Sequence, residues 1–259
     1  MTAAFDAGAA GYDAQELNPI VALLRSRSLL ALMAAFPPAS RLLDVGAGTG
    51  TEAMALAAAG RTVVACDPSP AMLARLTSKA ARRGLVIPAH PLAARDLPAL
   101  GEPGGAFDGA YSSFGALNAE PDLAPVAAAL GHLVRPGGAV ILGLMSRWAL
   151  PEIAGLVLAG RPRAAFRRTS GWARVGVEGS TLSVHYHVVG EVRAAITPWF
   201  DLVSVRSLGL LTPPPAAWPR VRALRPLLPL LDRVDAAVSG LPGLCRLGDH
   251  VVISLRRRG

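Results

Sequence analysis

Short apolar runs alternate with stretches of helical periodicity through the first 146 residues. Apolar runs that end at glycine or polar residues predict buried strands. These lie at residues 41–45, 62–66, 85–89, 107–112 and 139–144. Apolar side chains at helical spacing predict helices at residues 18–36, 51–59, 70–82 and 121–133. Strands and helices that alternate in this way imply crossover connections and a parallel sheet.

Local signals place the ends of these helices. Asn18 is a suitable N-cap for the first helix, with Pro19 at the first helical position. Pro37 and Pro38 then stop this helix, and Gly60 ends the next one. Residues 1–17 are small and polar without a strong period, so no element is expected there.

The pattern changes after residue 146. We expect a helix at 148–158, a hairpin across 172–189 that turns at Glu178-Gly179, a helix at 191–199, a strand at 202–211, broken helices over 212–247 and a last strand at 249–255. The predicted fold is α/β, Rossmann-like and doubly wound, with a mostly parallel seven-stranded sheet. A helical and hairpin cap is inserted in its C-terminal half, over the sheet edge where such folds bind ligands.

Charge is distributed unevenly along the 259 residues. Residues 1–146 hold 10 Arg or Lys and 11 Asp or Glu, whereas residues 147–259 hold 16 Arg and 7 Asp or Glu. A basic half suits an acidic partner, a phosphate-bearing substrate or a membrane surface. The alternative is coding composition, because Lys79 is the only lysine while Ala, Gly, Pro and Arg are abundant.

Several classes of protein are disfavoured. Cys66 and Cys245 are too few for a disulfide framework and form no C-x-x-C pair. The first sixteen residues contain acidic but no basic side chains, so we see no secretory signal. No apolar run approaches the roughly 20 residues of a membrane span. A cytoplasmic protein is the expectation.

The most informative stretch is residues 41–50, R-L-L-D-V-G-A-G-T-G. A strand, a glycine turn and a helix start bring backbone N–H groups and a positive dipole to one point, which suits an anionic group. A dinucleotide fingerprint needs glycine or alanine three residues after Gly48, but Thr51 stands there. Asp44 would be costly to bury without a partner, and Asp67 ends the next strand, where a carboxylate can accept from both ribose hydroxyls.

Five motifs follow one another in a characteristic order and spacing. They are D-V-G-A-G-T-G, C-D-P-S-P-A-M-L, A-A-R-D-L-P, F-D-G-A-Y-S-S-F-G-A-L-N and L-V-R-P-G-G-A-V-I-L-G-L-M. This series resembles that of class I S-adenosylmethionine-dependent methyltransferases, in particular the bacterial small-molecule type, and covers about residues 10–146. The resemblance implies S-adenosylmethionine as cofactor and S-adenosylhomocysteine as product.

The resemblance also implies a role for each matching residue. The turn around the methionyl part would be formed by Gly46, Ala47, Gly48 and Gly50. Asp44 would organise the amino group and Asp67 would hold the ribose. Ser112 and Ser113 would lie beside the sulfonium, and Tyr12 would close over the methionyl end. A purely structural role is the alternative for each, and it is strongest for Tyr12.

The adenine would lie between Pro68 and Met72 on one side and Leu97 on the other. Asp96 would accept from its amino group. With this core at residues 1–146, we expect one methyltransferase domain over residues 1–259. Acceptor-binding insertions would occupy residues 147–248, interleaved with the last core strands, and residues 249–257 would form the final strand.

Methyl transfer from a sulfonium is an in-line displacement, so the protein mainly aligns the acceptor and excludes water. A general base is needed only if the acceptor must lose a proton. The candidates are His187, His250 and Tyr12. His187 shares a strand face with His185, but no third ligand is evident and no metal site is expected. The alternatives are a polar strand face for His187 and strand capping with Asp249 for His250.

The acceptor is predicted mainly from absences. Residues 111–114 read Y-S-S-F instead of N-P-P-Y, which disfavours amide or exocyclic base nitrogens, and no RNA-binding module is appended. The predicted cap is rich in apolar side chains: Trp148, Ile153, Leu156, Phe166, Trp172, Leu210, Leu211 and Trp218. These favour a hydrophobic small molecule such as a natural product, a quinone or a lipid-like acceptor, although they also suit packing of the cap. Asn118 would orient the acceptor or cap a helix.

Two other functions stay open, and a nicotinamide dehydrogenase is a distant further one. The basic C-terminal half would suit an RNA or protein methyltransferase, although nucleic-acid binding is disfavoured by the lack of interleaved aromatics and lysines. The chain would instead be a non-catalytic cofactor-binding or membrane-associated protein if residues 219–231, P-R-V-R-A-L-R-P-L-L-P-L-L, lie on a bilayer. Three prolines interrupt that strip.

Overall fold

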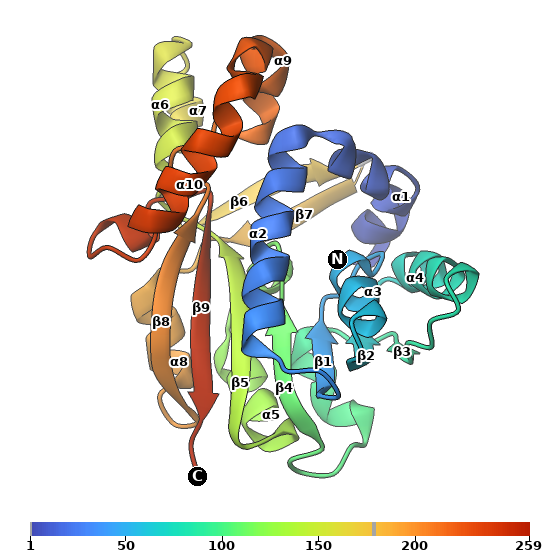
Figure 1. Ribbon diagram of the computed structural model, residues 1–259. Helices are drawn as coiled ribbons and strands as arrows, with labels where there is room; N and C mark the ends of the chain where they lie inside the picture. Colours follow the sequence, from blue (N-terminus) through green and yellow to red (C-terminus); the bar gives the residue numbers. More distant parts are fainter. Residues whose placement is uncertain (1, 178–179) are drawn as a thin grey trace.

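A computed structural model describes residues 2–177 and 180–259. Its centre is a seven-stranded sheet with helices on both faces (Figure 1). The strands are β1 (Arg41–Val45), β2 (Thr62–Cys66), β3 (Ala89–His90), β4 (Phe107–Ser112), β5 (Val134–Met145), β8 (Phe200–Leu208) and β9 (His250–Arg257). The larger helices are α1 (Thr2–Tyr12), α2 (Pro19–Ala35), α3 (Thr51–Ala58), α4 (Pro70–Arg82), α5 (Ala124–Leu133), α6 (Leu150–Leu158), α8 (Val189–Ile196) and α10 (Leu228–Val238).

The strand order is β3-β2-β1-β4-β5-β9-β8. The first five strands are parallel, while β9 runs antiparallel to both β5 and β8. The expected mostly parallel seven-stranded α/β fold is confirmed. Because parallel strands end at one edge, the loops after β1, β2 and β4 meet there.

Successive side chains of the central strands enter opposite cores. Leu42 and Val63 pack under α2, α3 and α4, whereas their neighbours Leu43 and Val64 pack under α5 and α8. A strand covered on both faces must be apolar at consecutive positions. This requirement explains why short continuous apolar runs marked the strands correctly.

Two expectations about local structure are wrong. The strand predicted at 85–89 is only the two-residue β3. Before it, Ile87 is buried in the core but Val86 is 87% exposed. Residues 2–12, where no element was expected, form α1. Its Ala- and Gly-rich sequence has little amphipathic pattern, and α1 is stabilised by contacts with α4 and the hairpin.

Two insertions leave the carboxyl edge of the sheet. The first follows β5 and contains α6, α7 (Pro162–Ala165) and the hairpin of β6 (Trp172–Val177) with β7 (Ser180–His185). Its predicted turn at Glu178-Gly179 lies outside the described residues. The second follows β8 and contains the expected broken helices, including α9 (Trp218–Val221) and α10. None of the described helices combines the length and apolar character needed to cross a bilayer.

A buried ion cluster fastens the first insertion to the sheet. Arg168, just after α7, contacts Glu152 of α6 and donates to Asp249 Oδ1 over 2.9 Å. All three side chains are at most 12% exposed. Burial alone would raise the pKa of Asp249, but His250 and Arg168 hold it below its ordinary value. The start of β9 is thereby tied to both ends of the α6–α7 segment.

Candidate active site

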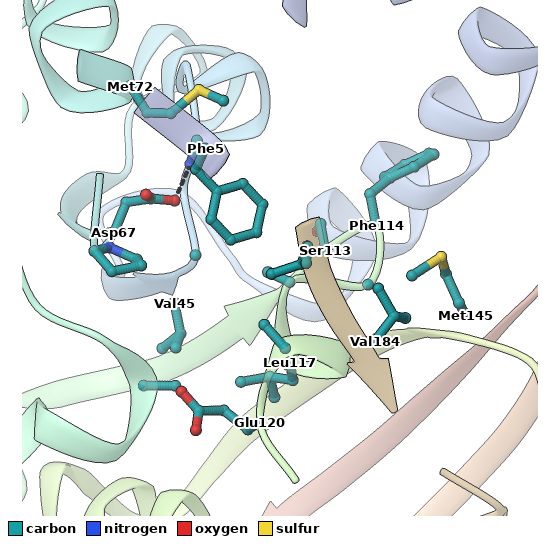
Figure 2. A pocket seen from close by; sticks show the side chains of 18 of the residues that line it. Phe5, Val45, Asp67, Met72, Ser113, Phe114, Leu117, Glu120, Met145 and Val184 are labelled. Carbon is teal, nitrogen blue, oxygen red and sulfur yellow. Dashed lines mark hydrogen bonds between the residues drawn. The ribbon is translucent and has the colours of Figure 1, made fainter. Parts of the chain in front are cut away.

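A cavity of about 250 Å³ lies over the carboxyl ends of β1, β2 and β4. Residues from α1 and from β7 form part of its wall on the side away from the sheet. Figure 2 shows Asp67, Val45 and Glu120 toward one end, and Phe114, Met145 and Val184 toward the other. The cavity therefore joins a partly polar end to an apolar end.

The glycine loop packs too tightly for side chains. Gly46 has φ +79°, and a Cβ there would lie 2.3 Å from the Cβ of Ala116. Gly50 has φ +82°, and a Cβ would lie 2.4 Å from Cγ of Leu76. Both positions need the left-handed backbone that glycine adopts freely. Gly46 thereby packs against Ala116, and Gly50 packs against Leu76.

Three N–H groups at the start of the glycine loop form hydrogen bonds within the fold. Gly46 and Ala47 both donate to the carbonyl of Cys66, over 2.8 and 3.0 Å. Gly48 donates to Asp67 Oδ2 over 2.8 Å. The start of the loop is thus braced on Cys66 at the end of β2 and on Asp67 just after it.

Asp67 lies on the wall of the cavity, and only 7% of its surface is exposed. Its Oδ2 accepts from Gly48, and its Oδ1 accepts from the Ser69 N–H over 2.9 Å. Burial raises the pKa of Asp67, although these two hydrogen bonds oppose the rise. Each carboxylate oxygen of Asp67 can accept a further hydrogen bond. Asp67 is therefore fixed in position and still offers two acceptor sites to a ligand in the cavity.

A small side chamber beside the glycine loop holds three charged groups. It is lined by Asp44, Glu52 and Arg25, with Tyr12 next to them. Asp44 is 2% exposed and accepts from the Tyr111 hydroxyl over 3.0 Å. Burial and then the neighbouring Glu52 raise the pKa of Asp44 well above its ordinary value. A cationic group placed here would relieve that cost.

Arg25 is a site residue that the sequence analysis missed. It lies on α2, and its Nη1 donates to both carboxylate oxygens of Glu52 over 2.7 and 2.9 Å. Its guanidinium also lies 4.6 Å from the centre of the Phe114 ring. The predicted N-cap signals placed this helix correctly, but no local pattern pointed to which arginine faces the loop.

Tyr12 lies at the junction of the cavity and the side chamber. Burial raises the pKa of its hydroxyl, although nearby Arg25 opposes the rise. The following Asp13 accepts from Thr49 Oγ1 over 2.5 Å and from Lys79 Nζ over 2.9 Å. The segment that carries Tyr12 is thereby held against both the glycine loop and α4.

The expected adenine contacts divide into two groups. Pro68 and Met72 line the cavity as expected. Leu97 is instead fully buried in the main core, and Ala94 lines the wall in its place. Asp96 is exposed and lies outside the cavity lining. Ala94, Asp96 and Leu97 all belong to the short helix η2 (Ala94–Leu100), and of these three only Ala94 lines the cavity.

Glu120 is the carboxylate that lines this end of the cavity. Its side chain is 4% exposed, and its Oε2 lies 3.7 Å from Arg95 Nη1. Burial raises the pKa of Glu120, and the charge of Arg95 opposes the rise. Sequence reasoning missed this residue because it lies in a loop between motifs.

Of the two serines at the end of β4, Ser113 lines the cavity. Ser112 is 1% exposed, and its Oγ has no hydrogen-bond partner among the described residues. Asn118 is fully buried; it donates to the His185 carbonyl over 2.6 Å and accepts from the Met145 N–H over 2.8 Å. It therefore braces the hairpin against β5, which is a structural role.

The two histidine candidates lie away from the cavity. His187 Nε2 is 2.8 Å from the carbonyl of Glu120, and the ring lines a separate polar hollow with His185. Burial lowers the pKa of His187. His250 packs against Phe114, with 5.1 Å between ring centres, and lies 3.1 Å from Asp249 Oδ2. Neither histidine is among the residues that line the cavity. The described residues contain no cluster suited to a metal ion.

The other end of the cavity is apolar. Phe5 comes from α1, Leu182 and Val184 from β7, Phe114 from the loop after β4 and Met145 from the end of β5. Leu182 and Val184 occupy alternate positions of β7 and are both buried, so they share its inward face. A hydrophobic group would bury its surface here beside Ser113.

Comparisons with known proteins agree with this geometry. A family model described as "Methyltransferase domain" matches residues 42–138. An uncharacterized protein of Mycobacterium tuberculosis is 34% identical over 131 residues, 51% of this chain, and the match covers 45% of that relative's length. A demethylmenaquinone methyltransferase of Parafrankia sp. is 33% identical over 239 residues, which cover 71% of this chain and 92% of that protein. The chain belongs to the class I S-adenosylmethionine-dependent methyltransferases.

A solved structure supports the same fold for this methyltransferase. A didemethyltoxoflavin N-methyltransferase of Burkholderia thailandensis, which holds its substrate and S-adenosylhomocysteine, aligns with a TM-score of 0.56. The two chains are 17% identical, and the alignment covers 92% of this chain and 79% of the other. The cofactor of the methyltransferase is S-adenosylmethionine. The held Asp67 carboxylate and the mixed charges of the side chamber fit its ribose and its amino-acid group.

Proposed function

We propose that the chain transfers a methyl group from S-adenosylmethionine to a hydrophobic small molecule. One observation carries the proposal: a single cavity joins the end that bears Asp67 and Glu120 to an apolar end under the β6–β7 hairpin. When bound, the cofactor supplies an activated methyl group. Its S–CH₃ bond breaks as the acceptor–CH₃ bond forms, and the electron pair stays on sulfur.

In this proposal the side chamber holds the amino-acid part of the cofactor. Asp44 and Glu52 attract its ammonium group, and Arg25 attracts its carboxylate. Tyr12 lies between the chamber and the cavity, since it lines both. Opposite charges placed in a water-poor chamber orient a zwitterion strongly.

Asp67 accepts from the ribose hydroxyls, which places the ribose between the two ends of the cofactor. Val45 and Pro68, which line the cavity near Asp67, would hold the adenine. We assign to Glu120 the hydrogen bond from the adenine amino group, in place of Asp96. The assignment rests on Glu120 being the buried carboxylate at that end of the cavity.

The acceptor occupies the apolar end beside Ser113. The described ionisable side chains that line the cavity are Tyr12, Asp67 and Glu120, and the last two belong to the cofactor end. An acceptor that needs little help from a base suits this wall, such as an acidic phenol or an enol. A quinol, the reduced and nucleophilic form of a quinone, is the first class to test, since its apolar substituent would pack on Phe114 and Leu182 and its proton would leave to solvent.

The test is incubation of the purified protein with methyl-labelled S-adenosylmethionine and fractionated lipid and quinone extracts. We expect labelled product in an apolar fraction, identified by mass spectrometry, and at least about tenfold less with the Asp67→Asn variant at S-adenosylmethionine concentrations well below its Kd. Labelling confined to RNA or protein fractions would contradict the proposed acceptor while leaving the methyltransferase assignment intact. Failure of the wild-type protein to bind S-adenosylhomocysteine would overturn both.

A further inference from the structure

Two segments that leave the carboxyl edge of the sheet combine exposed apolar side chains with arginines. The first arm is residues 150–168, which contain α6 and α7, and the second arm is residues 211–231, which contain α9 and the start of α10. Both project beyond the sheet at the same end of the molecule (Figure 1). The active-site cavity also lies at the carboxyl edge.

The first arm has large apolar side chains that are exposed to solvent. Leu158 is 88% exposed, and Phe166 is 49% exposed. Arg161 and Arg163 are exposed between them. The only acidic residue of this arm, Glu152, is buried in the ion cluster at the sheet edge.

The second arm repeats this chemistry. Its exposed apolar residues include Leu227 and Leu230, and its exposed cations are Arg220, Arg222 and Arg225. No acidic residue occurs between Asp201 and Asp232. Across the described chain, no carboxylate forms an ion pair with these three cations or with Arg161 and Arg163. The third exposed arginine of the first arm, Arg167, pairs with Glu152.

Exposed large apolar side chains are more scattered outside the two arms. Among the described residues before residue 147 they are Leu17, Leu30 and Val86, which lie far apart in the sequence. After residue 147 they are Trp148, Trp172, Val175, Val203, Val234 and Leu241. Scattered apolar side chains need no explanation, but exposed apolar groups that gather beside unpaired cations indicate an interaction surface. A nucleic acid would pair with the arginines but would leave the aliphatic side chains without an apolar partner. A second copy of this chain would place its arginines against the arginines of the first. An anionic lipid surface satisfies both groups at once.

We propose that the two arms dock the methyltransferase on an anionic phospholipid bilayer. The arginines meet the lipid phosphates, and Leu158, Phe166 and Leu230 enter the interface between headgroups and acyl chains. Docking at the carboxyl edge turns that edge toward the bilayer, from which a hydrophobic acceptor would enter the cavity. The last step rests on the proposed function, whereas docking itself requires no methyl transfer.

The test is co-sedimentation of the full chain with phosphatidylcholine vesicles that contain or lack phosphatidylglycerol. We expect binding only with phosphatidylglycerol, weakened by added salt. Each arginine near the surface contributes about fivefold to binding, so Arg161→Gln/Arg163→Gln should bind about 30-fold more weakly. Leu158→Ser/Phe166→Ser should also lose most of the binding.

Matched controls lie at the opposite edge of the sheet, near the end of α4. Arg82→Gln/Arg83→Gln removes the same charge, and Val86→Ser removes an equally exposed apolar side chain. Both controls should bind as the wild type does. Equal loss in arm and control variants, or absence of wild-type binding, would overturn the proposal. So would arm-dependent binding of RNA, or of a second copy, without vesicle binding.

Discussion

At the scale of single residues, the cavity is defined by carboxylates whose surroundings differ. Asp67 is held by two backbone N–H groups, Asp44 by a buried tyrosine, and Glu120 by Arg95 alone. Burial raises the pKa of all three. Buried carboxyl groups with raised pKa values are concentrated at functional sites. Each of the three can be tested by a substitution that removes one charge.

Asp67→Asn should weaken binding of S-adenosylhomocysteine by about 10- to 100-fold, because hydrogen bonds to a charged group contribute about 1.5–3 kcal/mol. Isothermal titration calorimetry measures the change. Asp108→Asn is the matched control, since Asp108 lies at the other edge of the sheet, where it accepts from the Arg41 N–H. Unchanged affinity in Asp67→Asn would refute the ribose assignment.

Glu120→Gln should alter the preference between S-adenosylhomocysteine and S-inosylhomocysteine, in which a carbonyl replaces the adenine amino group. A carboxylate repels that carbonyl, whereas a carboxamide can donate to it. We expect the wild type to favour the adenosyl compound and the preference to fall at least about tenfold in the variant. Asp96→Asn should leave it unchanged; the reverse result would return the adenine contact to Asp96.

At the scale of elements, the insertions are attached by a few specific contacts. The α6–α7 segment is fixed by the buried cluster of Arg168, Glu152 and Asp249, and β7 is braced by Asn118. A buried ion pair is costly to break, since removal of one partner leaves an uncompensated charge. The strand that covers the cavity alternates inward apolar and outward polar positions.

Arg168→Ala should therefore lower the free energy of unfolding by about 3–5 kcal/mol. The neighbouring Arg167 also contacts Glu152, but its side chain is 53% exposed. Arg167→Ala should cost no more than about 1 kcal/mol. Urea denaturation of both variants measures the difference. Similar losses in the two would show that burial of the cluster is unimportant.

Leu182→Asn should raise the KM for the acceptor while the affinity for S-adenosylhomocysteine stays within about twofold. The physical reason is that an unpaired amide replaces an apolar contact at the acceptor end. Ser183→Asn, on the outward face of the same strand, is the control. A parallel loss of cofactor affinity would place the cofactor, not the acceptor, under the hairpin.

At the scale of the whole molecule, one sheet links the cofactor half to the second half of the chain. β5 pairs with β9 along seven registered residue pairs, and β9 in turn pairs with β8. We propose that residues 1–259 form one domain with a core at 1–146, insertions at 147–248 and the last strand at 249–257. Contacts that continuous should make unfolding cooperative.

Thermal or urea unfolding should accordingly show a single transition. S-adenosylhomocysteine at about 100 times its Kd should stabilise the whole molecule by about 2.7 kcal/mol. Near-ultraviolet circular dichroism, with tryptophans at residues 148, 172, 199 and 218, reports on the second half. Two transitions, with only one shifted by the ligand, would contradict the single-domain proposal.

The sequence by itself determined the parallel core and the cofactor. The glycine loop and Asp67 are close in sequence, and each element there is both periodic and locally capped, so a linear pattern contains the information. Only the tertiary structure brought Arg25 to Glu52, turned Asp96 outward, and set Glu120 into the cavity wall. Such contacts join distant segments, and their geometry depends on packing that no local period encodes.

The same distinction explains the helix that sequence reasoning missed and the position of His187. The α1 helix lacks an amphipathic pattern and is stabilised by contacts with neighbouring elements. His187 follows β7, and its imidazole contacts the carbonyl of Glu120, which is 67 positions away in the sequence. Local propensity is weak in both places, and tertiary contacts decide the outcome. The sequence determined which cofactor is bound, because that part of the site is local. The structure decided which residues surround it, because those contacts are long-range.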